Sequence, residues 1–159
     1  MHYWLMKTEP SSFSVEDLAA AARRTTAWDG VRNYQARNML RDQMKRGDQA
    51  FLYYSSTEVP GIVAIMQIVK EGYPDPTAFD RKNHHYDADS DPRNPRWFMV
   101  DVQLKRRLAR TISLEELRAR RQGAQRHGAA AARQPVVHHA GRTRAVEVHS
   151  VARVMCRLS

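Results

Sequence analysis

The order of strand-like and helix-like segments restricts the fold of this chain more than any other feature of its sequence. Short apolar and aromatic runs bounded by turn residues predict strands at His2–Lys7, Gln49–Tyr54, Gly61–Val69 and Trp97–Leu104. Helical spacing and capping signals predict helices from Ser14 to about Arg23, from Asn33 to about Met44 and at Leu114–Ala119. Because these elements do not alternate as in a parallel sheet, we predict an α+β fold: a curled, barrel-like β-sheet with short flanking helices.

A loop of 22 residues, Tyr73–Asn94, separates the third and fourth predicted strands. It is rich in Pro, Asp and Asn, and loops of this length in a small domain are usually functional or disordered. Phe79 and Tyr86 indicate that the loop packs against the domain. This favours a functional loop.

Charge divides the chain into two unequal parts. The net charge is +9, yet residues 120–159 hold eight of the 26 Lys and Arg residues, one of the 17 acidic residues and no aromatic residue. The first 119 residues are almost balanced. The basic composition therefore does not indicate a nucleic-acid groove, and we assign a domain to residues 1–119 and an atypical basic tail to residues 120–159.

The sequence shows neither a membrane signal nor a disulfide pattern. No run approaches the roughly 18 apolar residues of a membrane span, and the first ten residues lack the layout of a signal peptide. Cys156 is the only cysteine, which excludes an internal disulfide. We therefore expect a cytoplasmic protein with no membrane partner.

Two clusters of reactive residue types carry little chemical signal. Asp87, Asp89 and Asp91 follow two histidines and match the opening of a calcium-binding loop, but Pro92 and Phe98 stand where that loop needs Gly and Glu. We expect no metal and no cofactor. A second cluster is Lys7-Thr8-Glu9 at the end of the first strand, whose residue types could perform acid–base chemistry. Backbone and surface contacts are the simpler interpretation of these three residues.

Aromatic residues at turns give a stronger signal. Most aromatic side chains in the chain are expected to be core, because they bury large areas. Trp28, Tyr34 and Tyr73 differ, because they stand at turns and loop edges beside Asp29, Arg32, Asn33 and Asp75. Aromatic faces with a few converging polar groups suit a planar heterocycle such as a base.

Several segments closely resemble one family. They are YWLMKTEP at 3–10, WDGVRNYQARN at 28–38, GDQAFLYYSS at 47–56, PGIVAIMQIVKEGYPDPTAFD at 60–80 and NPRWFMVDV at 94–102. In this order they resemble the EVE domain, a member of the PUA-like superfamily. The resemblance implies a small curled sheet with helices, and a non-catalytic module whose partner is a modified base in DNA or RNA.

The resemblance also implies a set of ligand-binding residues. The main set lies at the end of the first strand and in the second motif: Lys7, Thr8, Trp28, Arg32, Asn33 and Tyr34. Weaker candidates are Tyr53, Ser55, Tyr73 and Asp75, and Tyr54 stands where many relatives carry His. In this interpretation Trp28 stacks on the base and the amide of Asn33 reads its edge.

Residues 120–159 depart from the family, which ends with a further strand and a short helix. When the reading frame is advanced by one base, codons allowed by residues 125–152 can encode a family-like ending. The residues that follow then permit a stop codon. We therefore expect an off-frame tail with no ligand role, poor packing beyond about residue 119 and an uncovered sheet edge.

Two other functions remain open. A small amidohydrolase of the PUA-like superfamily acting on a modified nucleoside would use Lys7, Thr8 and Glu9, although adjacent strand residues point to opposite faces. A purely structural RNA-binding domain would be indifferent to base modification.

Overall fold

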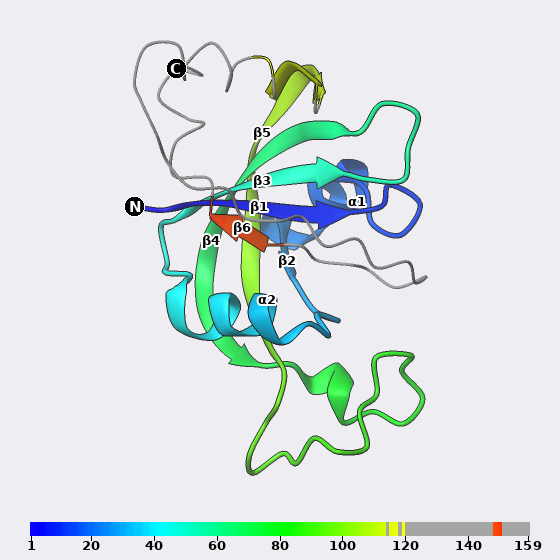
Figure 1. Cartoon of the computed structure of the whole chain (residues 1–159), viewed down its shortest axis with the longest axis vertical. Coiled ribbons are helices and arrows are strands. Elements are labelled where there is room, and N and C mark those ends of the chain that lie inside the picture. The colour runs from blue at the N-terminus through cyan, green and yellow to red at the C-terminus, as the bar shows by residue number, and fades with distance from the viewer. Residues whose placement is uncertain (114, 118, 120–147, 151–159) are drawn as a thin grey trace.

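The structure is a computed structural model that describes residues 1–113, 115–117, 119 and 148–150. Its centre is a six-stranded sheet in the order β2-β5-β4-β3-β1-β6, shown in Figure 1. The strands are β1 (Tyr3–Thr8), β2 (Thr25–Ala27), β3 (Gln49–Tyr54), β4 (Gly61–Pro74), β5 (Phe98–Ser113) and β6 (Val148–Ser150). The predicted curled α+β fold is confirmed, but the sheet is open and is not a closed barrel.

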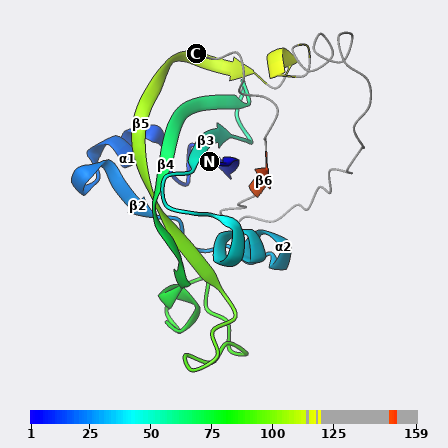
Figure 2. The same cartoon turned by 90° about the vertical axis from the view of Figure 1, so that its left-hand side faces the viewer.

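Two long strands give the sheet its curvature. β1 and β3 run parallel, whereas β4 is antiparallel to both β3 and β5. The pairing of β4 with β5 shifts register at four points, and such irregularities bend strands and increase their twist. Figure 2 shows both strands as strongly curved ribbons, with the loop that joins them extending away from the sheet.

The helices are short and begin where capping residues stand. α1 (Val15–Ala20) starts with the predicted capping box, in which Ser14 Oγ accepts from the Asp17 backbone at 3.1 Å. α2 (Tyr34–Asn38) continues into a π-helical segment, η2 (Met39–Gln43), and η1 (Ala22–Arg24) and η3 (Pro76–Ala78) are 3₁₀ turns. The capping box of Ser113 and Glu116 is also present. In the described part of the chain, no helix is long and apolar enough to cross a membrane.

The sheet is packed on both faces. The larger cluster lies between the sheet and the helices and includes Trp4, Met6, Leu18, Trp28, Leu40, Met44, Leu52, Met66, Ile68 and Val102. The smaller cluster contains Phe51, Tyr53, Ile62 and Ile112. Alternate residues of β3 enter different clusters, because successive strand side chains point to opposite faces. The first cluster holds the start of α2 and the end of β1 in fixed positions.

The sheet differs from the sequence predictions in several places. β2 was not predicted, and β4 continues five residues beyond Val69 to Pro74, into the predicted loop. β5 extends nine residues beyond Leu104 through a charged stretch whose backbone pairs with β4. β6 pairs antiparallel with Trp4–Met6, so the expectation of an uncovered sheet edge is wrong at these three residues of β1. The other residues of the predicted tail beyond 119 lie outside the described ranges.

Candidate functional site

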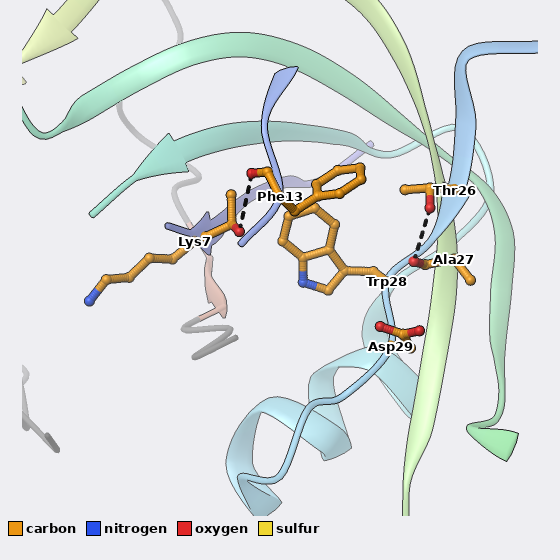
Figure 3. A pocket seen from close by; sticks show the side chains of 7 residues that line it. Lys7, Phe13, Thr26, Ala27, Trp28 and Asp29 are labelled. Carbon is orange, nitrogen blue, oxygen red and sulfur yellow. Dashed lines mark hydrogen bonds between the residues drawn. The ribbon is translucent and has the colours of Figure 1, made fainter. Parts of the chain in front are cut away.

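A hollow opens where β1 ends beside β2. It is open to solvent, measures about 260 Å³ when that open space is included, and is lined by Lys7, Thr8, Phe13, Thr26, Ala27, Trp28 and Asp29. Figure 3 shows these residues converging from β1, from the loop before α1, and from β2 with the turn that follows it. We call this feature the Trp28 hollow. It brings together three of the predicted site residues.

Trp28 is both part of the core and a wall of the hollow. Its side chain is 5% exposed, its backbone N–H donates to the Val100 carbonyl at 2.8 Å, and Phe13 packs edge-on against its ring. The indole Nε1 of Trp28 is buried without an acceptor among the described residues, whereas those of Trp4 and Trp97 donate to carboxylates. The ring of Trp28 is therefore fixed in place and retains an unused donor.

The end of β1 contributes through its main chain and one hydroxyl. Thr8 is 2% exposed, and its Oγ1 lies 3.4 Å from the carbonyl oxygens of both Glu9 and Phe13, which are long hydrogen bonds. The Thr8 carbonyl accepts from the Ser55 backbone at 3.0 Å. In Figure 3 the side chain of Lys7 extends away from Trp28, so Lys7 meets the hollow with its backbone.

Arg32 and Asp75 join the turn after Trp28 to the long loop. The Asp75 carboxylate is fully buried and accepts from Arg32 Nη1 at 2.9 Å, from the Gly30 backbone at 3.0 Å and from Thr77. Arg32 also donates to the His85 carbonyl from Nε and Nη2. Burial raises the pKa of Asp75, but hydrogen bonds from Thr77, Arg32 and Gly30 outweigh it and leave the pKa below its ordinary value.

These contacts give Arg32 and Asp75 a positioning role. The donors of Arg32 are engaged by protein oxygens, and its guanidinium lies over the Trp97 ring at 5.3 Å. The pair therefore holds the turn on which Trp28 stands. A direct contact of either residue with a ligand stays a prediction.

His85 packs against the same turn. It is 5% exposed, and its Nδ1 has no partner among the described residues. Burial lowers the pKa of His85, and the neighbouring His84 and Arg32 lower it further. The ring is therefore neutral at physiological pH. His85 is the second of the two histidines that precede Asp87, and in the described ranges no three His, Cys, Asp or Glu side chains are grouped to hold a metal.

Asn33 and Tyr34 lie at the exposed start of α2. Asn33 Oδ1 caps the helix by accepting from the Ala36 backbone at 2.9 Å, which leaves the amide NH₂ as the group free to read a ligand. Tyr34 is 54% exposed, with its ring 5.0 Å from that of Trp97 and under the guanidinium of Arg37. Neither residue lines the Trp28 hollow.

The weaker candidates are dispersed. Tyr53 points into the smaller core cluster on the opposite face of β3 from Leu52. Tyr73 donates its hydroxyl to Asp101 at 2.5 Å, and burial together with this hydrogen bond raises the pKa of the phenol. Ser55 donates to the Thr8 carbonyl from its backbone N–H at 3.0 Å and from its hydroxyl at 3.4 Å, and it does not line the hollow. The structure does not bring these residues to the hollow.

Four lining residues were not among the predicted site residues: Phe13, Thr26, Ala27 and Asp29. Thr26 and Ala27 belong to β2, whose three residues are too short for a recognisable pattern. Asp29 was noted only as a polar neighbour of Trp28. Tyr54, the departure from the family pattern, accepts from the Val15 backbone at 2.6 Å and so caps α1.

Comparison with known proteins identifies the family. The EVE domain profile matches residues 2–146. The chain belongs to the EVE domain family. This EVE chain is 54% identical over 126 residues to mouse thymocyte nuclear protein 1, covering 74% of this chain and 55% of the mouse protein. It thus spans about half the length of the curated relatives it matches.

Solved structures show the same fold. The human THYN1 protein in complex with 5-methylcytosine containing DNA superposes with a TM-score of 0.74 at 49% identity, covering 80% of this chain and 79% of that one. A protein from Pseudomonas putida superposes with a TM-score of 0.69 at 45% identity, covering 74% and 76%. The PUA-like EVE fold of this chain is therefore confirmed.

Proposed function

We propose that this EVE domain is a non-catalytic module that binds a modified base of a nucleic acid, and that the base enters the Trp28 hollow. The observation that carries the proposal is the hollow itself, which is open to solvent and lined by a fixed indole ring and the buried end of β1. The similar human THYN1 protein, solved with 5-methylcytosine containing DNA, supports 5-methylcytosine in DNA as the first ligand to test.

The composition of the hollow suits a planar base with an added methyl group. The Trp28 ring offers a surface for stacking, which is worth roughly 1–3 kcal/mol per base. Phe13 and Ala27 supply apolar surface for a methyl group. Thr8 and the main chain of β1 supply polar groups for the edge of the base. A base inside a duplex must leave the stack to enter such a site.

The arrangement of Lys7, Thr8 and Glu9 supports binding over amidohydrolase chemistry. The Lys7 side chain extends away from Trp28, whereas the Thr8 hydroxyl is held near the Phe13 carbonyl (Figure 3). Glu9 Oε1 accepts from Ser56 Oγ at 3.0 Å. An acid–base group needs its members within hydrogen-bond reach of one reacting atom, and these three side chains diverge.

The test compares duplexes that differ at one base. Fluorescence anisotropy would measure the affinity for a duplex with one 5-methylcytosine and for the same duplex with cytosine, and mass spectrometry would check the recovered nucleosides. We expect tighter binding of the methylated duplex and unchanged nucleosides. Equal affinity would favour an unselective nucleic-acid domain, and a changed nucleoside would favour the amidohydrolase.

The cellular location belongs to the same proposal. The vertebrate relatives carry the name thymocyte nuclear protein. We therefore propose that the protein acts where the DNA is, in the nucleus of a eukaryotic cell or in the cytoplasm of a bacterial cell.

A further inference from the structure

Three exposed cations lie at the start of β2. Arg23 and Arg24 in η1 and Lys105 in β5 are exposed, and in the described ranges no acidic side chain forms an ion pair with them. Two arginines further along β5 are different, because Arg107 pairs with Glu16 and Arg110 pairs with Glu116. The first three therefore present positive charge that the protein itself does not neutralise.

A chain of hydrogen bonds groups these cations. Lys105 Nζ donates to Gln103 Oε1 at 2.7 Å, and Gln103 Nε2 donates to the Arg23 carbonyl at 3.1 Å. Gln103 is also the strand partner of Thr25, the residue that follows Arg24. Arg23, Arg24 and Lys105 thus occupy one corner of the sheet, which we call the cationic corner.

The turn that carries Arg23 and Arg24 has an unusual backbone conformation that hydrogen bonds stabilise. Arg23 and Arg24 have φ angles of 54° and 52°, in the left-handed region that residues other than glycine rarely adopt. The Arg23 carbonyl also accepts from Thr25 Oγ1 at 3.0 Å, and the Arg24 backbone donates to Ala21 at 2.8 Å. Two consecutive residues adopt the left-handed conformation only where surrounding contacts stabilise it, so these hydrogen bonds fix the positions of both arginines.

β2 connects the cationic corner directly to the Trp28 hollow. Trp28 lies four residue steps beyond Arg24, with Thr25–Ala27 between them, and at about 3.3 Å per strand residue this is roughly 13 Å. One strand of DNA rises about 3.4 Å per nucleotide. The corner therefore lies within reach of phosphates up to about four nucleotides from a base held in the hollow.

We propose that the cationic corner binds phosphates of the strand whose modified base occupies the Trp28 hollow. The inference rests on the proposed function, because it fixes the strand relative to that site. Arginine and lysine neutralise backbone phosphates without reading sequence, so the corner adds affinity and sets the position of the strand. Selectivity for the modified base remains with the hollow.

The experiment measures salt dependence with charge-matched variants. Anisotropy titrations would compare the wild type, R23Q/R24Q and the control R81Q/K82Q. Each protein would be titrated with the methylated and the plain duplex at salt concentrations of about 50–300 mM, where the release of counterions changes the affinity. Arg81 and Lys82 are exposed cations of the loop after η3, which Figure 1 draws far from β2. Gln keeps a long unbranched side chain, and thermal melting checks that each variant is folded.

We expect R23Q/R24Q to reduce the slope of log affinity against log salt by about 1.8, two phosphates at roughly 0.9 each, and to weaken both duplexes roughly 30-fold at 0.15 M salt. The ratio between the duplexes should not change. Lys105→Gln, on a different strand, should lower the slope by about 0.9. The control should leave the slope unchanged.

Equal effects of R23Q/R24Q and R81Q/K82Q would overturn the proposal, as would an unchanged slope in folded R23Q/R24Q and Lys105→Gln. A reduced ratio between methylated and plain duplexes in R23Q/R24Q would also overturn it, because the corner would then take part in base recognition. Failure of the proposed function gives a different result: the wild type would bind the methylated and plain duplexes equally. The slope of log affinity against log salt could still be measured for every variant, so the two failures are distinguishable.

Discussion

His85 lies so close to Gly30 that a Cβ atom at position 30 would come within 2.5 Å of the imidazole Nε2. Gly30 also has a φ of +75°, and its N–H donates to the buried Asp75 carboxylate. The turn that follows Trp28 is therefore fixed from two sides, by a ring packed on the glycine and by a carboxylate on its backbone. This contact links the long loop to the Trp28 hollow.

The first prediction follows from this contact. Gly30→Ala should lower the free energy of unfolding, because alanine meets the left-handed backbone cost of roughly 1–2 kcal/mol and also collides with the His85 ring. It should also weaken binding of the methylated duplex by displacing Trp28. Urea denaturation and anisotropy on the same sample would measure both effects.

Gly47→Ala is the matched control. Gly47 has a φ of +99°, but nothing lies within 4 Å of a Cβ built there, so alanine meets only the backbone cost. We expect a smaller loss of stability and unchanged binding. If Gly30→Ala and Gly47→Ala behaved alike, the contact between Gly30 and His85 would not position the site.

Much of the fold could be predicted from the sequence because its signals are local. The capping residues before α1 and the short apolar and aromatic run of β3 are signals from residues a few positions apart, and both predicted elements are confirmed. β2 escaped prediction because its three residues carry no pattern and exist as a strand only through pairing with Asp101–Gln103. The charged half of β5 is likewise held by β4 and not by its own composition.

The site was harder to predict for a related reason. Trp28 was singled out because an aromatic residue at a polar turn is a local signal. The partners of Arg32 are not local: Asp75 lies 43 residues away and His85 lies 53 residues away. The residue types in the WDGVRNYQARN motif indicate candidate side chains, but only the fold distinguishes those that line the hollow from those that position its walls.

A second prediction concerns acid stability. Because the native pKa of Asp75 lies below its ordinary value, the stabilisation by its charge is present above the unfolded pKa of about 3.9 and is lost as pH falls through the lower native pKa. Asp75→Asn should cost about 3 kcal/mol at neutral pH, since it removes one partner of a buried ion pair, and should flatten the decline below pH ~4. Urea unfolding between neutral and acid pH measures both.

The control for this prediction is Asp42→Asn. Asp42 forms an exposed ion pair with Arg41, and such pairs contribute little. We expect nearly unchanged stability. A pH profile for Asp75→Asn that matches the wild type would show that Asp75 does not contribute to acid sensitivity.

A third prediction separates two roles of Asn33. Asn33→Ala should lower stability by about 1 kcal/mol, because it removes the N-cap of α2. Asn33→Asp keeps an oxygen for the cap but loses the amide donor, so it should melt like the wild type. If the amide reads the base, Asn33→Asp should also lose preference for the methylated duplex. Retained preference in Asn33→Asp would limit Asn33 to capping.

A fourth prediction concerns residues 120–159, which we propose to be an off-frame segment without a ligand role. These residues carry a net charge of +7, from eight arginines and Glu147, and a family-type ending would take their place. Non-specific, salt-sensitive binding should fall, whereas the ratio between methylated and plain duplexes should not change. A lost ratio would show that this segment takes part in recognition, and the codons of the gene would test the frame directly.

The last prediction tests Trp28 itself. Trp28→Ala removes a side chain that is 5% exposed, so it should cost about 3–5 kcal/mol of stability, the usual range for a buried aromatic. It should also weaken binding of the methylated duplex about tenfold or more, because stacking is worth roughly 1–3 kcal/mol per base. Melting and affinity must be measured on one sample, with affinity corrected for the folded fraction.

The control for Trp28→Ala is a core substitution away from the hollow. Ile68 is fully buried in β4 and does not line the hollow, so Ile68→Ala should lower the melting temperature while leaving the affinity of the folded fraction and the ratio between duplexes unchanged. If Trp28→Ala behaved in the same way, the indole would serve the core alone and the base would bind elsewhere. A loss of affinity confined to Trp28→Ala would identify the hollow as the binding site, because both variants carry comparable damage to the same core cluster.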